Sequence, residues 1–194
     1  MSEPTVLIVP GLRDHVDAHW QTLLALDLRA RGRKVAMVPP MGRVDLDCSA
    51  RVAAIERAAQ AIDGPLVLVA HSGGCVMVAH WARQTERPVR GALLATPPDF
   101  ERPLPEGYPT IGALRGSGWL PVPRQPLPFA SVVAASRDDP LGRFERIEQL
   151  ACDWGSRLVD LGRVGHLNPA SGYGDWARAD AFIDELSTHV KDAA

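Results

Sequence analysis

The feature that most constrains the fold of this chain is residues 66–74, LVLVAHSGG, an apolar run that ends abruptly in three small residues. Residues 66–70 suit a buried strand, and residues 75–82 continue after the turn without Gly or Pro, as an uninterrupted helix does. The pattern predicts a strand, a sharp turn and a helix, with Ser72 at the apex of the turn. Such an arrangement is typical of a nucleophile elbow, which projects a serine hydroxyl from the end of a sheet.

Short apolar runs alternate with segments of helical spacing along the rest of the chain. The predicted strands cover residues 5–9, 34–38, 66–70, 89–95, 130–135 and 156–161, and the predicted helices cover residues 15–31, 49–62, 72–84, 142–154 and 175–190. This alternation indicates the α/β class, as a three-layer α/β/α sandwich with about six mainly parallel strands. Because no internal repeat or linker divides the chain, residues 1–194 are expected to form a single domain.

The alternation breaks in residues 97–128, which hold nine of the 17 prolines. Proline fixes φ and removes a hydrogen-bond donor, so regular structure in this segment should be short. An irregular segment of this length in a compact domain is usually functional or mobile. Its aromatic residues Phe100, Tyr108 and Trp119 are expected either to line a pocket or only to pin the segment to the core.

Composition excludes several classes of function. The net charge of −2 argues against a nucleic-acid partner, and no apolar run approaches the roughly 20 residues that span a bilayer. The N-terminal apolar run lacks a basic flank and is interpreted as a strand, not a secretory signal. Three widely spaced cysteines do not suggest a disulfide framework, so a cytoplasmic location is expected. The oligomeric state stays open.

Three residues with complementary chemistry follow predicted strands in the order Ser72, Asp139 and His166. Parallel strands deliver these positions to one edge of the sheet, and the order is the one found in α/β-hydrolases. A serine hydroxyl needs a base within hydrogen-bond reach, histidine can take and return its proton, and a carboxylate orients the imidazole. Asp139 is favoured over Asp138 as the acid because it directly precedes Pro140, which leaves Asp138 as a solvated neighbour or a capping residue.

An oxyanion also needs hydrogen-bond donors. The N–H of Gly73, at the start of a helix, is one candidate, and the N–H of Leu12, after the first strand, is the other. Ala70 replaces the first glycine of the G-x-S-x-G pattern, and alanine is small enough to meet the same steric demand.

Other polar residues near these loops receive supporting roles. His71 is expected to prop the elbow or to line the pocket, and Trp119 and Asn168 are further candidates for the pocket. Asn168 and Ser171 are also placed to orient the histidine loop. Cys75, one helical turn past the serine, is expected to be a buried small hydrophobe.

His15 and His19 stand four residues apart in a predicted helix, which is a conceivable metal pair. No glutamate completes an H-E-x-x-H pattern, so no metal site is predicted. His19 and Trp20 are instead expected to pack beneath the pocket. No cofactor is expected either.

Four motifs together resemble one small α/β-hydrolase family, the retinoblastoma-binding-protein-type serine hydrolases and their bacterial relatives of the YdeN type. The motifs are His19-Trp20-Gln21, His71-Ser72-x-Gly, Ala135-Ser136-x-x-Asp139-Pro140 and Gly165-His166-x-Asn168. The spacing of Leu127-Pro128-Phe129 and of Ser171-Gly172-x-Gly174-x-Trp176 is most similar to the bacterial branch. The resemblance runs from Val6 to the last helix, and it implies a compact α/β-hydrolase fold without a large cap.

The resemblance also implies Ser72 as nucleophile, Asp139 as acid and His166 as base. It does not imply a retinoblastoma-protein partner, because residues 46–50, LDCSA, lack the glutamate of the L-x-C-x-E motif. The expected function is a serine hydrolase that cleaves a small-molecule ester or amide through an acyl-enzyme. Two alternatives stay open: a non-catalytic binding or scaffold protein with the same fold, and a cofactor-free haloperoxidase or C–C hydrolase that uses the same residues.

Overall fold

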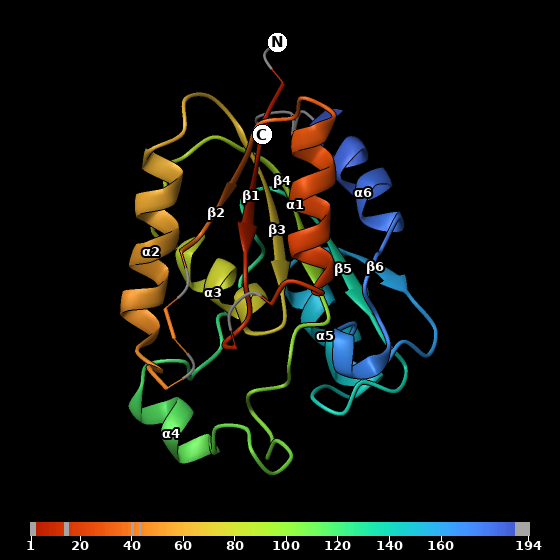
Figure 1. The fold of residues 1–194 in the computed structure, drawn as a ribbon. Helices are drawn as coiled ribbons and strands as arrows, with labels where there is room; N and C mark the ends of the chain where they lie inside the picture. Colours follow the sequence, from red (N-terminus) through yellow and green to blue (C-terminus); the bar gives the residue numbers. More distant parts are fainter. Residues whose placement is uncertain (1–2, 14–15, 40, 43, 189–194) are drawn as a thin grey trace.

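The structure, a computed structural model, describes residues 3–13, 16–39, 41–42 and 44–188 and is built around one six-stranded parallel sheet (Figure 1). Its elements in chain order are β1 (Thr5–Val9), α1 (Trp20–Ala30), β2 (Val35–Met37), α2 (Cys48–Gln60), β3 (Leu66–His71), α3 (Gly73–Trp81), β4 (Val89–Ala95), α4 (Ile111–Gly116), β5 (Ala130–Ala135), α5 (Phe144–Asp153), β6 (Arg157–Asp160), the 3-10 helix η1 (Pro169–Ser171) and α6 (Arg178–Thr188). The predicted α/β class and strand–helix alternation are confirmed.

The order of the strands determines where a site can form. The sheet runs β2-β1-β3-β4-β5-β6, and each neighbouring pair is parallel. After β1 the chain moves outward to β2, then returns to the other side of β1 and proceeds from β3 to β6. The connections therefore diverge between β1 and β3, and in open parallel sheets a ligand binds at such a point, beyond the carboxyl ends of the strands.

Two apolar layers cover the sheet, because successive side chains of a strand point to opposite faces. Leu7 and Val9 of β1 belong to one buried cluster, with residues of α2, α3 and α5. Val6 and Ile8 belong to the other cluster, with residues of α1 and α6. Figure 1 shows these helices on the two sides of the sheet. Every residue of β1 and β3 is buried, which explains their continuous apolar sequences.

Helix α1 begins later than the predicted residue 15. His19 adopts an extended conformation, φ −75° and ψ 139°, and its side chain accepts a hydrogen bond from the N–H of Gln21, so the helix starts at Trp20. The helix ends at Ala30, and Gly32, with φ 82°, follows in the left-handed conformation expected of a residue after a helix. His15, the first member of the conceivable metal pair, lies outside the described residues.

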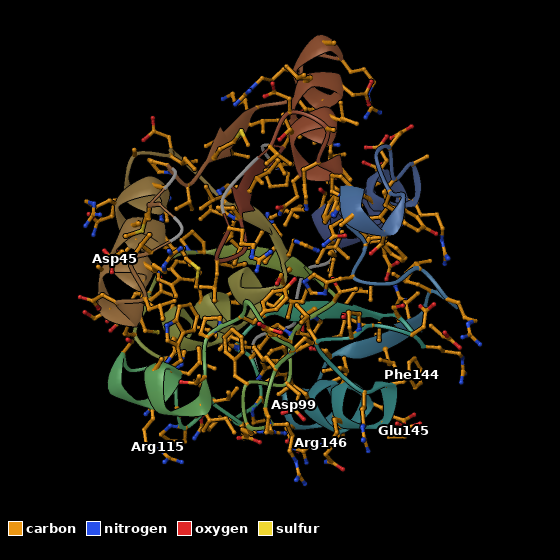
Figure 2. The ribbon with its side chains drawn as sticks, turned by 60° about the horizontal axis from the view of Figure 1, so that its bottom comes forward. Asp45, Asp99, Arg115, Phe144, Glu145 and Arg146 are labelled. Atoms are coloured by element: carbon orange, nitrogen blue, oxygen red, sulfur yellow. The ribbon has the colours of Figure 1, made fainter. Side chains whose placement is uncertain are left out.

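The proline-rich segment 97–128 contains only one short helix, α4, as expected. It is tied to the core by Trp119, which is completely buried and donates its Nε1–H to the carbonyl oxygen of Leu46 at 2.7 Å. At the other end, Asp99 forms an ion pair with Arg146 of α5, with Nε and Oδ2 3.0 Å apart (Figure 2). The segment is thus irregular but anchored at both ends.

No described helix has the length and apolar character needed to cross a membrane.

Candidate active site

Ser72 occupies the turn between β3 and α3 in a conformation that non-glycine residues rarely adopt. Its φ is 54° and its ψ is −130°, so the backbone is strained. The N–H of Ser72 donates to the carbonyl oxygen of Ala95 at 2.9 Å, and its own carbonyl accepts from the N–H of Cys75 at 2.9 Å. Although Ser72 stands at the N-cap position of α3, its side chain forms no capping hydrogen bond. The hydroxyl is therefore available for another partner.

Small residues let helix α3 cross closely over the end of β1. A Cβ at position 74 would lie 2.6 Å from the carbonyl oxygen of Pro10 and 2.7 Å from that of Val9, closer than real Cβ atoms approach backbone. A Cβ at Gly73 would lie 2.9 Å from Cγ of Leu12. The close approach of these two backbones requires glycine after Ser72, and it brings the loop after β1 against the elbow.

Ser72, His166 and Asp139 form a continuous hydrogen-bonded chain. Ser72 Oγ lies 2.8 Å from His166 Nε2, and His166 Nδ1 lies 2.9 and 3.0 Å from the two carboxylate oxygens of Asp139. The side chains of His166 and Asp139 are only 6% and 3% exposed, so water competes weakly with these contacts. The structure thus brings together the three residues that the sequence pattern singled out.

Asp138 faces a different partner. Its Oδ1 accepts hydrogen bonds from Ser136 Oγ at 2.9 Å and from the N–H of Gly165 at 2.8 Å. The Gly165 N–H in particular lowers the pKa of Asp138 below the usual value of a carboxyl group. Asp138 therefore connects the loop after β5 to the histidine loop, and it is exposed, which agrees with the solvated neighbour that we considered and not with a helix-capping residue.

The main chain of His166 is held on both sides. Its N–H donates to Ser171 Oγ at 3.0 Å, and that hydroxyl donates to Asn168 Oδ1 at 2.9 Å. Its carbonyl oxygen lies 2.9 Å from His71 Nε2. The imidazole is therefore positioned through its backbone as well as through Asp139, and Asn168 and Ser171 have the orienting contacts that we expected.

His71 is a buried support of the site. Burial, together with the neighbouring His166 and His19, lowers the pKa of His71 well below 6.5, so the ring is neutral at physiological pH. A neutral ring that contacts a carbonyl through Nε2 carries its proton on that nitrogen, because the carbonyl can only accept. The His71 ring packs against His19 with centroids 4.7 Å apart and against Trp20 at 5.9 Å. The expected packing of His19 and Trp20 beneath the site is confirmed.

The two expected oxyanion donors lie side by side. A Cβ at Gly73 would be 3.5 Å from the backbone nitrogen of Leu12, and a Cβ at Gly11 would be 3.5 Å from Ser72 Oγ. Gly73 is the first residue of α3, where backbone N–H groups have no partner within the helix. Within residues 3–13 and the other described ranges, the N–H groups of Leu12 and Gly73 form no hydrogen bond with the protein.

A pocket of about 720 Å³ opens beside Ser72. Its apolar lining includes Leu12, Val16, Leu46, Phe100, Leu104 and Leu141. His71 and Asn168 line it as expected, but Trp119 does not. Trp119 packs edge-to-face against Phe100, with ring centroids 5.4 Å apart, on the core side of that ring. Its role is to pin the proline-rich segment, whereas Phe100 and Tyr108 reach the pocket.

Two supporting groups received no separate role from the sequence pattern. The buried side-chain amide of Gln21 donates to the carbonyl oxygens of Val9 at 3.1 Å and Val69 at 3.0 Å, which ties the ends of β1 and β3 together. Arg13 lines the pocket mouth and donates to the carbonyl oxygen of Gly107 at 2.8 Å. In the sequence, Gln21 was noted only as part of the motif His19-Trp20-Gln21, which does not say what the amide contacts.

Cys75 is completely buried, and its thiol donates to the carbonyl oxygen of Ala95 at 3.3 Å. Burial raises the pKa of this thiol well above 9.0, so Cys75 behaves as the small hydrophobe that we expected. Among the described residues, no group of three or more His, Cys, Asp or Glu side chains is arranged to hold a metal ion.

Comparison with protein families decides the affiliation of the chain. A family model described as serine hydrolase matches residues 6–185. The chain belongs to the serine hydrolase family. The match to the family model extends from β1 to α6, so it includes the whole sheet and every loop of the site. The YdeN-like resemblance of the sequence motifs is confirmed by the solved structures that follow.

This serine hydrolase is similar in structure to a YdeN-like hydrolase from Pectobacterium atrosepticum, with a TM-score of 0.78, 27% identity, and 95% of this chain and 91% of that chain covered. The ydeN gene product of Bacillus subtilis has a TM-score of 0.73 and 17% identity, with 94% and 98% covered. A monoacylglycerol lipase from Paleococcus ferrophilus has a TM-score of 0.68 and 14% identity, with 97% and 96% covered. No curated protein matches the chain in sequence.

The protein is therefore a hydrolase with the α/β-hydrolase fold. The family supports a small-molecule substrate in general terms.

Proposed function

We propose that this serine hydrolase cleaves a small carboxylic ester or an amide through an acyl-enzyme, with Ser72 as nucleophile, His166 as general base and Asp139 as the orienting acid. The observation that carries the proposal is the contact of 2.8 Å between Ser72 Oγ and His166 Nε2, in a ring whose other nitrogen faces Asp139. A serine becomes an effective nucleophile when such a base is within hydrogen-bond reach.

In the first half of the reaction, Ser72 Oγ attacks the carbonyl carbon while its proton passes to His166 Nε2. The π electrons of the carbonyl move to its oxygen, which then accepts hydrogen bonds from the N–H groups of Leu12 and Gly73. When the tetrahedral intermediate collapses, the bond to the alcohol or amine breaks. The leaving group takes the proton from His166, and the acyl group remains on Ser72.

In the second half, His166 takes a proton from water, which attacks the acyl carbon through a second tetrahedral intermediate. Collapse breaks the bond to Ser72 Oγ, and Ser72 recovers its proton from His166. Asp139 holds the tautomer with a proton on Nδ1 and stabilises the imidazolium that forms twice in each cycle. Because both side chains are almost completely buried, this stabilisation is weakly screened.

The geometry also bears on the non-catalytic alternative. A scaffold protein that had lost turnover should show a blocked pocket or a displaced histidine. Here the histidine contacts the serine, and an open pocket of about 720 Å³ borders the hydroxyl. Both observations support turnover, and so does the family.

A fluorophosphonate probe tests the proposal, because it reacts with activated serines. We expect covalent labelling of the wild-type protein at the peptide that contains Ser72, identified by mass spectrometry, and no labelling of Ser72→Ala. Ser117→Ala, which changes a serine that does not line the pocket, should be labelled like the wild type. Labelling of folded protein at another residue, or no labelling, would refute the assignment of the nucleophile.

A further inference from the structure

We infer that the substrate of this pocket is an anionic acyl compound, with an apolar body and a terminal carboxylate that is bound by Arg13. The inference rests on the proposed function, because it deepens the description of the same site. It starts from the charges around the pocket. Among the described residues that line it, Arg13 is the single arginine, and there is no lysine, aspartate or glutamate.

Arg13 is held in place at the mouth of the pocket. Its Nη2 donates to the carbonyl oxygen of Gly107 at 2.8 Å, and its guanidinium lies 4.2 Å from the centre of the Tyr108 ring. Gly107 and Tyr108 also line the pocket. These contacts fix the position of the guanidinium where the loop after β1 meets the proline-rich segment. A cation that is already positioned loses little conformational entropy when it binds an anion.

The contacts of Arg13 leave its charge available. A guanidinium has five N–H donors. Within the described residues, Arg13 uses one of them in the hydrogen bond to Gly107 and forms no ion pair with a carboxylate. Asp17, in the same loop, is exposed and does not line the pocket. A carboxylate is the ligand that a guanidinium binds best, through two parallel hydrogen bonds.

The location of Arg13 relates the charge to the chemistry. Leu12, whose N–H is a proposed oxyanion donor, is the residue next to Arg13, and consecutive Cα atoms are about 3.8 Å apart. Arg13 and Ser72 line the same pocket, so one ligand that fills the pocket can reach both residues. The lining of this pocket also includes the apolar residues Leu12, Phe100 and Leu104, which suit methylene groups.

A matched pair of substrates isolates the charge. The probes are 4-nitrophenyl monoesters of straight-chain dicarboxylic acids with six to nine carbons, long enough to disfavour attack by their own carboxylate. Each is compared with the ester in which a primary amide replaces the free carboxylate, so length and shape stay nearly constant. The measured quantity is the charge preference, defined as kcat/KM of the carboxylate substrate divided by kcat/KM of the amide substrate.

For the wild type we expect a charge preference of about 10 at the best chain length, which is the ratio that a charge-assisted hydrogen bond of about 1.4 kcal/mol produces. In Arg13→Gln the charge preference should fall to about 1, because kcat/KM for the carboxylate substrate falls much further than kcat/KM for the amide substrate. Arg13→Lys should recover only part of the preference, because an ammonium keeps the charge but cannot form the two parallel hydrogen bonds. In 1 M salt the wild-type preference should fall several-fold, because the pair is partly exposed to solvent.

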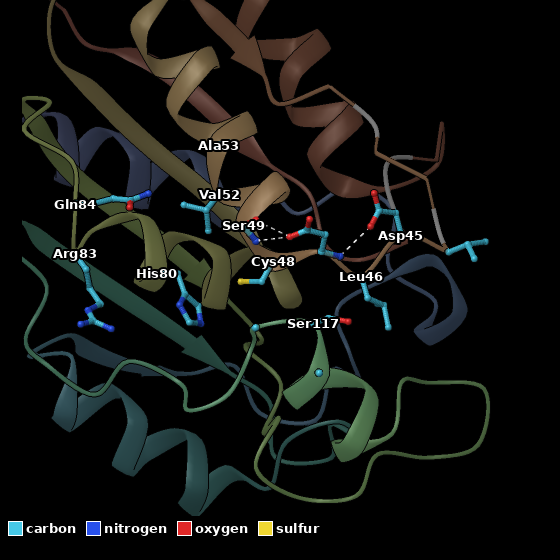
Figure 3. Close-up of a pocket in the computed structure, with 14 residues that line it drawn as sticks. Asp45, Leu46, Cys48, Ser49, Val52, Ala53, His80, Arg83, Gln84 and Ser117 are labelled. Carbon is cyan, nitrogen blue, oxygen red and sulfur yellow. Dashed lines mark hydrogen bonds between the residues drawn. The ribbon is translucent and has the colours of Figure 1, made fainter.

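The matched control is Arg83→Gln, which changes the net charge of the protein by the same amount. Arg83 lines a different hollow of about 1150 Å³ beside α2 and α3, together with His80 and Ser117 (Figure 3). Ser72 and His166 do not line that hollow. The charge preference of Arg83→Gln should equal that of the wild type, which separates a local effect of Arg13 from a change in overall charge.

The inference is overturned if the charge preference of the wild type is 1 or less at every chain length. It is also overturned if Arg13→Gln and Arg83→Gln have the same charge preference. Failure of the proposed function looks different, because then neither substrate is hydrolysed and Ser72 is not labelled. Charge selection is still measured in that case by calorimetry of Ser72→Ala with the two substrates. Tighter binding of the carboxylate substrate, lost in the Ser72→Ala, Arg13→Gln double variant, supports the inference; equal binding refutes it.

Discussion

Gly74→Ala is expected to reduce both stability and activity, although alanine is the better helix former. Gly74 lies in α3, and in an ordinary helix the change to alanine stabilises by about 0.5–1 kcal/mol. Here the new Cβ would lie 2.6 Å from the carbonyl oxygen of Pro10 and 2.7 Å from that of Val9. Both neighbours are backbone oxygens at the end of the buried strand β1, so no side-chain rotation can relieve the clash.

The magnitude follows from how far α3 must move. Reaching an ordinary contact requires a displacement of about 0.7 Å, and overpacking of this kind costs about 1–3 kcal/mol. For a chain of this length, a loss of 2 kcal/mol lowers Tm by about 4–8 °C. The displacement also moves Ser72 and Gly73 relative to Leu12, and since a misplacement of 1 Å costs about 100-fold in rate, kcat/KM should fall by about 10- to 100-fold.

The assay combines a thermal melt with hydrolysis of a 4-nitrophenyl ester, and Gly116→Ala is the matched control. Gly116 ends α4, and a Cβ there would meet nothing within 4 Å. Its substitution should leave kcat/KM unchanged and should raise Tm or leave it unchanged. If Gly74→Ala behaved like Gly116→Ala, the close crossing of α3 over β1 would not constrain the elbow, and the reasoning would fail.

Three further predictions concern individual side chains. Asp139→Asn should lower kcat by about 10³- to 10⁴-fold in a folded protein, because the imidazole loses its preferred tautomer, whereas Asp138→Asn should lower kcat less than tenfold. Steady-state kinetics measures both losses, with circular dichroism as the folding control, and equal losses would contradict the assignment of Asp139 as the acid. His71 is neutral in the folded protein with a pKa below its unfolded value of 6.5, so the unfolded state binds more protons and the free energy of unfolding should fall as the pH drops below about 6.5, by at most about 1.4 kcal/mol per pH unit from this residue. Urea melts between pH 5 and 8 give the free energy of unfolding at each pH, and this free energy should depend less steeply on pH in His71→Gln than in the wild type. An unchanged pH dependence would show that another group is responsible. Trp119→Phe removes the hydrogen bond to Leu46 and should cost about 1–3 kcal/mol of stability. The value of kcat/KM for a small ester should nevertheless stay within twofold of the wild type. A large change in KM with unchanged stability would instead indicate that Trp119 contacts the substrate.

Much of the fold was predictable because its signals are local. The strands β4 and β5 have the predicted bounds, and the apolar runs that indicated buried strands were easy to find since both faces of β1 and β3 are covered. The start of α1 was predicted too early, because the helical spacing of apolar residues continues upstream of His19. The helix begins only at Trp20 because the backbone of His19 is extended and its side chain accepts a hydrogen bond from the N–H of Gln21.

The catalytic candidates were predictable for another reason. Parallel strands bring the residues that follow them to one edge, so chain order and residue type were enough to select Ser72, Asp139 and His166. Side-chain contacts across the molecule were not predictable in the same way. Whether Trp119 faced the pocket or the core depended on the path of an irregular, proline-rich segment, in which no periodicity relates one residue to the next.

The division of labour between the sheet edge and segment 97–128 has an evolutionary consequence. Ser72, Asp139 and His166 follow β3, β5 and β6. The segment after β4 contributes Pro98, Phe100, Leu104 and Tyr108 to the pocket wall and none of these reacting groups. Exchange of segment 97–128 therefore alters which substrates fit the pocket and leaves Ser72, Asp139 and His166 in place. Among relatives with this architecture, differences in substrate should accordingly follow the sequence of segment 97–128 more closely than overall identity, and transplanting this segment between two homologues is a direct way to transfer selectivity.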